Sequence, residues 1–118
     1  MKMTKDMAAL RASSQARLDA LFVERYAAIL GPMHAIHTRK AAEAQRVIEH
    51  AVTSLLLAPE ARRRGVTQKT LAGEVMTRAQ RQASQLGALE AERQDAQAEI
   101  AAARSPAELD SVIAAHGG

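Results

Sequence analysis

The feature that most constrains this chain is a run of positions in its second half, spaced alternately three and four apart after the first step. We call these positions the seam: Leu71, Val75, Ala79, Gln82, Leu86, Leu89, Arg93, Ala96, Ile100 and Ala103. Heptad spacing of this kind places all of them along one edge of an α-helix, where a second helix can cover them. The pattern therefore predicts one long helix over residues 67–104 that makes coiled-coil contacts.

The first half of the chain, residues 1–57, also carries apolar residues at helical spacing. Gly31 and Pro32 interrupt this pattern, because glycine lowers helix propensity and proline cannot donate a helical hydrogen bond. We therefore expect two N-terminal helices with a break at Gly31–Pro32. Residues 58–66, which contain Pro59 and Gly65, are expected to form a connection to the long helix.

The ends of the later helices have recognisable capping residues. Thr67 precedes the long helix as a predicted N-cap. Ser105, Pro106 and Glu108 have the order of a capping box with proline at the first helical position. Residues 105–118 are therefore expected to form a short C-terminal helix and a tail.

These segments predict an all-α fold, because no stretch shows the lasting alternation of half-buried strands. Short connections favour antiparallel neighbours, so we expect an elongated antiparallel hairpin or small bundle, a single domain overall. Alanine supplies 27 of the 56 hydrophobic residues, which leaves few large side chains for a core. The seam faces either the chain's own first half or another subunit. Its candidate core or interface residues are Leu71, Val75, Leu86, Leu89, Arg93 and Ile100.

The sequence offers no catalytic or cofactor-binding set. The absence of cysteine excludes disulfides, thiolate metal sites and thiol nucleophiles. His34 and His37 lie near Glu43, but no metal-binding motif accompanies them, so we predict no metal and no cofactor. Neither a nucleophile elbow nor a phosphate-binding glycine loop is present. We expect a protein that is not an enzyme and, lacking a run of about 20 apolar residues, does not cross a membrane.

The chain has more basic than acidic residues, with a net charge of +3 and a pI near 9.8. This excess makes nucleic-acid binding an alternative function. The candidate phosphate contacts are Arg62, Arg63, Arg64, Lys69 and Arg78. Thr67-Gln68 followed by Leu71-Ala72 resembles the start of a helix-turn-helix domain, yet the seam continues where a turn and a recognition helix belong. A small basic helical DNA-associated or regulatory protein is therefore the second hypothesis.

A wider pattern of apolar, arginine and glycine positions extends over much of the chain. Its residues are Glu43-Ala44, Arg64-Gly65-Val66, Leu71-Ala72, Val75, Ala79, Gly87, Leu89, Arg93-Gln94, Ile100, Ala103, Ser105, Glu108-Leu109 and Val112. This pattern resembles a helical module of tailed-bacteriophage tail proteins. The resemblance implies a structural or assembly protein of a phage or phage-derived particle, in the virion or in the bacterial cytoplasm during assembly. It also implies that the partners are other protein subunits or further copies of the same chain.

Overall fold

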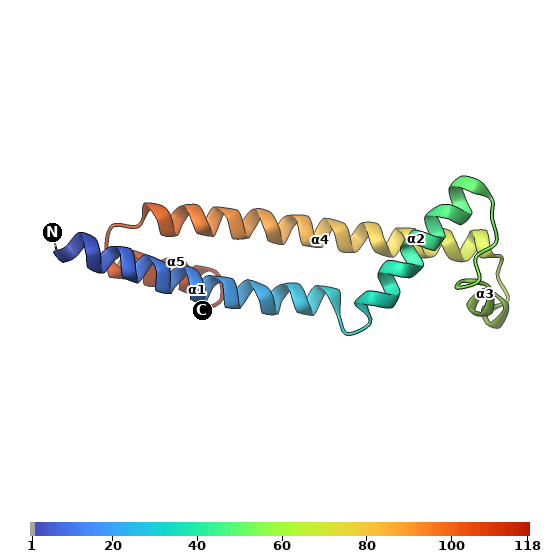
Figure 1. The fold of residues 1–118 in the computed structure, drawn as a ribbon, viewed down its shortest axis with the longest axis horizontal. Coiled ribbons are helices and arrows are strands. Elements are labelled where there is room, and N and C mark those ends of the chain that lie inside the picture. Colours follow the sequence, from blue (N-terminus) through green and yellow to red (C-terminus); the bar gives the residue numbers. More distant parts are fainter. Residues whose placement is uncertain (1) are drawn as a thin grey trace. The chain divides into compact units, whose positions relative to one another are not determined.

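The computed structural model in Figure 1 describes the backbone of residues 2–118 and the side chains of residues 6–118, and Met1 lies outside it. Every regular element in this part of the chain is an α-helix, which confirms the all-α prediction. The helices are α1 (Lys2–Leu30), α2 (His34–His50), α3 (Ala58–Arg64), α4 (Gln68–Ala102) and α5 (Pro106–Ala115). Within the described residues, no helix combines the length and the apolar character that a membrane span requires.

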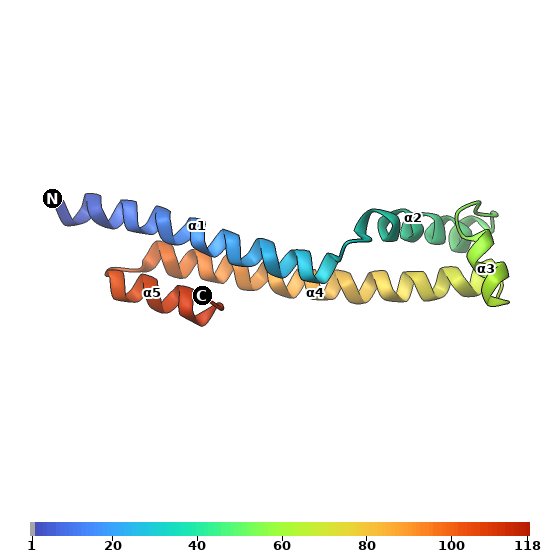
Figure 2. The ribbon, with the colours of Figure 1, turned by 90° about the horizontal axis from the view of Figure 1, so that it is seen from below.

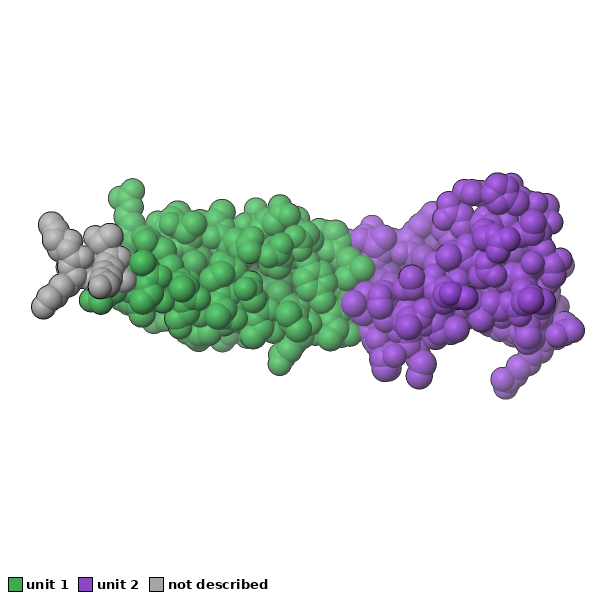
Figure 3. All heavy atoms as spheres, in the orientation of Figure 1, with its two compact units in different colours: residues 1–29, 86–118 green, residues 30–85 purple. Residues whose placement is uncertain are grey.

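The residues group into two compact units, although we expected a single domain; Figure 3 colours them separately. Unit 1 comprises residues 1–29 and 86–118, and unit 2 comprises residues 30–85. The long helix α4 contributes its first part to unit 2 and its last part to unit 1. Each unit has a hydrophobic cluster of its own.

Unit 1 is built from α1, the end of α4, and α5. Its core joins side chains from all three helices. The buried members are Met7, Leu18, Phe22, Leu89, Ala96, Ile100, Ala103, Leu109, Val112 and Ile113. Figures 1 and 2 show α5 running alongside α1 and the last turns of α4. Four of the seam positions thus supply one wall of this core.

Unit 2 is built from α2, α3 and the beginning of α4. Its core contains smaller side chains than that of unit 1. The buried members are Ala44, Val47, Leu57, Ala61, Leu71, Ala72 and Val75. In Figure 2, α2 lies along the first part of α4, and α3 lies near the start of that helix. Alanine allows these helices to approach closely, but it buries little apolar area per residue.

Several helix ends are stabilised as the sequence suggests. The backbone N–H of Thr70 donates to Thr67 Oγ1 at 3.0 Å, which caps α4, and that of Glu108 donates to Ser105 Oγ at 3.2 Å, which caps α5. The Glu108 carboxylate accepts from the N–H of Arg104, one residue before the N-cap. Between α1 and α2, Gly31 adopts a left-handed φ of 72°, so the helical path ends where Gly31–Pro32 was expected to break it.

Two expectations about the middle of the chain are wrong. The second helix was expected to reach Leu57 but ends at His50, because Ala51 adopts a left-handed conformation (φ 52°, ψ 34°) and closes the helix. Residues 58–66 were expected to be a connection, but most of them form α3. Pro59 lies in the first turn of α3, where its missing N–H costs no hydrogen bond. Gly65 then ends α3 with a φ of 68°.

Buried Ser54 fixes the loop between α2 and α3. Its N–H donates to Gln68 Oε1 at 2.8 Å, and its hydroxyl donates to Glu43 Oε1 at 3.2 Å. The same hydroxyl accepts from the N–H of Leu57, also at 3.2 Å. Because these partners lie on α2, on α4 and at the start of α3, Ser54 sets the path by which the chain leaves α2.

Candidate functional site

The seam residues serve mainly as core within each unit. Leu71 and Val75 are buried in unit 2, and Leu89 and Ile100 are buried in unit 1. Leu86 is half-buried. Arg93 is also half-buried, and its Nε donates to the Glu90 carboxylate at 2.8 Å. Helices of the same unit thus cover most of the buried seam positions, and these side chains are not free to contact another molecule.

In unit 1, two carboxylates on α4 link the helices by hydrogen bonds. Glu92 accepts two hydrogen bonds from Arg25 on α1, at 2.7 and 2.9 Å, and lies 2.8 Å from Nδ1 of His116. Hydrogen bonds from Arg25 and then His116 lower the pKa of Glu92 to about 2. Bonds from Arg93, then from the Tyr26 hydroxyl, lower the pKa of Glu90 to about 2. Glu92 is thus held by an ion pair to α1, and Glu90 by an ion pair within α4 and a hydrogen bond from α1, so both carboxylates have a structural role.

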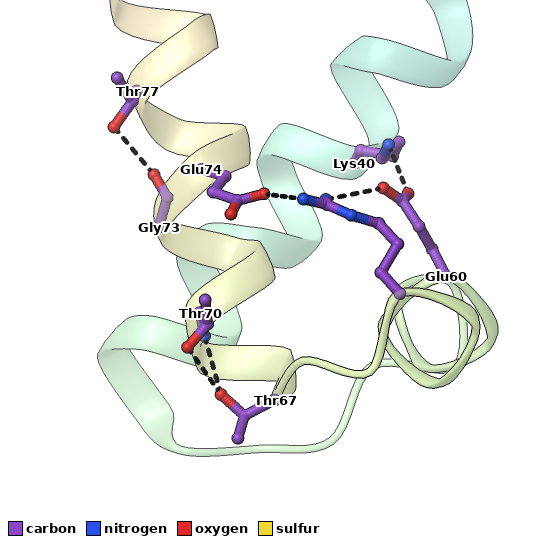
Figure 4. A network of polar contacts seen from close by, with 8 residues as sticks. Lys40, Glu60, Thr67, Thr70, Gly73, Glu74 and Thr77 are labelled. Atoms are coloured by element: carbon purple, nitrogen blue, oxygen red, sulfur yellow. Dashed lines mark hydrogen bonds and ion pairs between the residues drawn. The ribbon is translucent and has the colours of Figure 1, made fainter.

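In unit 2, an ion-pair network contains Arg64, one of the candidate phosphate contacts. Its guanidinium lies 2.7 Å from Glu74 on α4 and 3.5 Å from Glu60 on α3. Glu60 also pairs with Lys40 on α2 at 2.6 Å, so the network ties three helices together (Figure 4). The hydrogen bond with Glu74 raises the pKa of Arg64. Arg64 therefore has a structural role here that the sequence pattern did not reveal.

The other four basic candidates are exposed in unit 2. Arg62 and Arg63 lie on α3, whereas Lys69 and Arg78 lie on α4. Among the described residues, no ion pair joins any of these four to a carboxylate. Unit 2 as a whole contains nine Lys and Arg against four Asp and Glu, whereas unit 1 contains seven against nine. The basic excess of the chain is therefore confined to unit 2.

A groove of about 240 Å³ lies between α2 and α4 within unit 2. We call its apolar lining residues, Ala41, Val75 and Ala79, the floor and its polar lining residues the rim. The rim residues are His37, Thr38, Lys40, Arg78 and Gln82, of which Lys40 and Arg78 carry positive charge. No acidic residue lines the groove. A groove with an apolar floor and basic side chains at its rim can bind an apolar group that has a negatively charged group next to it.

Sequence reasoning identified the four groove residues of α4 for other reasons, Val75, Ala79 and Gln82 as seam residues and Arg78 as a phosphate contact. It missed the contribution of α2. The sequence indicates the groove only through helical spacing. Positions 37 and 41 lie four apart on one helix, and positions 75, 79 and 82 lie four and three apart on the other. That spacing does not say which face of α2 turns toward α4.

No set of three or more His, Cys, Asp or Glu side chains is placed to hold a metal ion in the part of the chain that the structure describes. Comparisons with protein-family models, with curated proteins and with solved structures find no match. The geometry of the groove and the charges around it are therefore the features from which a function can be argued.

Proposed function

We propose that this chain is a helical protein without enzymatic activity that acts by binding other protein subunits. The observation that carries the proposal is the groove between α2 and α4, whose floor of Ala41, Val75 and Ala79 is not filled by α3, the remaining helix of unit 2. A groove between two helices suits a third helix, because ridges of side chains on one helix fit between rows of side chains on its neighbours.

The resemblance of residues 64–112 to phage tail proteins supports a particular set of partners. On the basis of that pattern, we propose that the partners are subunits of a phage or phage-derived particle. The chain binds them in the virion or in the bacterial cytoplasm during assembly. Further copies of the same chain belong to the same class of partner. Only the residue pattern supports this part of the proposal, whereas the groove supports protein binding in general.

The second candidate function, contact with DNA or RNA, is favoured by the unpaired basic residues Arg62, Arg63, Lys69 and Arg78 in unit 2. Such binding would weaken steeply as salt rises, because each phosphate contact releases a counterion. A contact made largely by apolar side chains would change little over the same range. The apolar floor of the groove favours protein, since a phosphate backbone offers nothing apolar to cover it.

Photo-crosslinking from the groove tests the proposal on the full chain. Thr38 lines the groove and is exposed, whereas Ala42 on the same helix is exposed but does not line it. Replacing Thr38 with p-benzoylphenylalanine should give a protein adduct in the producing cells, and the same replacement at Ala42 should not. The partner identified by mass spectrometry must then bind the purified chain. Equal adducts at both positions, or no protein adduct from Thr38, would overturn the proposal.

A further inference from the structure

The way unit 1 completes its core suggests what the groove of unit 2 receives. In unit 1, the short helix α5 buries Leu109, Val112 and Ile113 against α1 and α4. The same helix exposes Glu108 and Asp110 and carries no Lys or Arg over residues 106–115. An acidic amphipathic helix is therefore the third member of that three-helix unit.

Unit 2 lacks a third helix at the equivalent place. All eight residues that line its groove belong to α2 or α4. The third helix of the unit, α3, contributes Ala61 to the core and no residue to the groove. The α2–α4 pair thus has an open face of small apolar side chains that no helix of its own unit fills.

The excess of basic side chains in unit 2 also has no acidic partners within the unit. Each of its four carboxylates lies close to a basic side chain of the same unit. The pairs are Glu43–Arg46 at 3.0 Å, Glu49–His50 at 3.9 Å, Glu60–Lys40 at 2.6 Å and Glu74–Arg64 at 2.7 Å. At the rim of the groove, Lys40 is engaged with Glu60, but Arg78 is exposed and forms no ion pair with the described residues. Together with His37, whose ring can donate a hydrogen bond, Arg78 leaves the rim open to an acidic group.

From the open face and the unpaired charge we infer that the groove binds an acidic amphipathic helix of a protein partner. The inference rests on the proposed function and names the chemistry of the partner. The apolar side chains of that helix cover Ala41, Val75 and Ala79, and its carboxylates lie beside Arg78 and His37. Alanines in the floor let the backbone of the partner approach closely, and the unpaired arginine selects the sign of its charge.

The experiment uses the full chain and two synthetic helical peptides of about 14 residues, roughly four turns. Both peptides carry leucines at the same positions of one face, and their flanks carry glutamates in one peptide and lysines in the other. In about 0.1 M salt, fluorescence anisotropy should show the acidic peptide binding at least about tenfold more tightly than the basic one.

Two pairs of variants locate the site. Arg78→Ala should weaken binding of the acidic peptide about threefold to tenfold, whereas Arg81→Ala, at an exposed arginine outside the groove, should not change it. Ala79→Leu fills the floor and should weaken binding by more than about tenfold, whereas Ala83→Leu on the exposed side of α4 should not. Helix content measured by circular dichroism shows whether each variant is folded.

Several outcomes would overturn the inference. Equal binding of the two peptides, or equal effects of Arg78→Ala and Arg81→Ala, would show that the groove does not select acidic helices. Competition by a short DNA duplex that depends on Arg78 and displaces the peptide would identify nucleic acid as the ligand. Self-association lost in Arg78→Ala would identify a second copy. A protein adduct from Thr38 without binding of the acidic peptide would reject this inference and retain the proposed function. If neither the adduct nor peptide binding is observed, the inference and the proposed function are both rejected.

Discussion

Units 1 and 2 share the helix α4 but complete their cores in different ways. Unit 1 surrounds the end of α4 with α1 and α5, buries Phe22 and Leu18, and contains more acidic than basic residues. Unit 2 packs small side chains between α2 and α4 and carries the basic excess. Among the described residues, four of the six large apolar side chains that stay exposed lie in unit 2. They are Met33, Ile36, Ile48 and Leu55, against Leu10 and Val23 in unit 1.

The difference shows that one heptad pattern can serve two purposes along a single helix. In unit 1 the seam positions Leu89, Ala96, Ile100 and Ala103 belong to a core formed by three helices. In unit 2 the seam residues Val75, Ala79 and Gln82 line a groove instead. The regular spacing specifies the buried edge of the helix, and the size and number of the neighbouring helices decide whether that edge is fully covered.

A charge placed in either core should cause the largest loss of stability. Leu89→Asp in unit 1 and Leu71→Asp in unit 2 replace buried leucines, and each should lower the free energy of unfolding by about 3–5 kcal/mol. If the two units are stabilised separately, hydrogen exchange will rise more within the unit that carries the substitution. Chemical denaturation measures the total loss, and exchange measured by mass spectrometry assigns it to a unit.

The matched control is Ala88→Asp, which introduces the same charge at an exposed position next to Leu89. It should change the free energy of unfolding by less than about 1 kcal/mol. An equal loss in Ala88→Asp and Leu89→Asp would show that the described face of α4 is wrong. Uniform loss of protection in both units would show that they unfold as one cooperative body.

Acid should weaken unit 1 through Glu90 and Glu92. Because the folded-state pKa of each is about 2, below the ordinary 4.5, both carboxylates stabilise the fold fully above about pH 4.5. That contribution falls as the pH drops from 4.5 toward 2. Glu92→Gln removes one of the two carboxylates, so the difference in unfolding free energy between about pH 6 and about pH 3 should be smaller than in the unaltered chain. Urea denaturation at the two pH values measures it.

Ala91→Gln provides the control for this titration, because it introduces the same amide side chain at an exposed position of the same helix without removing a carboxylate. It should leave the pH dependence as it is. If Glu92→Gln retains the full pH dependence, then the hydrogen bonds from Arg25 and His116 do not stabilise the charged carboxylate.

The sequence predicted the helical class and several helix ends because these depend on local chemistry. Thr67 and Ser105 cap the helices that follow them, and each does so through its own side-chain oxygen. The end of α2 was mispredicted because it depends on distant partners. Leu55 and Leu57 continue an apolar pattern, but Ser54 is held by Glu43 and Gln68, and these hydrogen bonds turn the chain.

The candidate site was only partly predictable for a similar reason. Exposed Arg78 could be selected from its charge, and Val75 from its spacing. Whether an arginine is free depends on the acids that the fold brings to it. Arg64 and Arg78 look alike in the sequence, yet only Arg64 meets Glu74 and Glu60. A groove depends on two helix faces meeting, which no single stretch of sequence encodes.

Substitution of the two glycines inside α4 should raise stability by a similar amount in each unit. Gly73 lies in unit 2 and Gly87 in unit 1, and at either position an added Cβ would meet no atom within 4 Å apart from its chain neighbours and the backbone of its own helix. Gly73→Ala and Gly87→Ala should each increase the free energy of unfolding by about 0.5–1 kcal/mol, because alanine has the higher helix propensity. Thermal denaturation followed by circular dichroism measures the gain.

Gly65→Ala is the control for these two variants, since the space around Gly65 is also open but its φ is 68°. It should destabilise the chain, because an L-residue in the left-handed region costs about 1–2 kcal/mol. A much larger gain at Gly87 than at Gly73 would indicate that the two parts of α4 differ in helical order, which would sharpen the contrast between the units.

The smallest expected effect concerns Ala51, the one non-glycine residue with positive φ among those described. Ala51→Gly relieves the left-handed strain of about 1–2 kcal/mol but makes the unfolded chain more flexible, which costs about 0.4–1 kcal/mol. The net gain should be about 0.5 kcal/mol, measured as an increase in the denaturation midpoint of unit 2.

Ala42→Gly, at an exposed position inside α2, should instead lower stability by about 1 kcal/mol. Because glycine weakens a helix interior and suits a left-handed C-cap, opposite signs at the two positions would show that α2 ends at His50, whereas losses at both would mean that the helix continues toward Leu57.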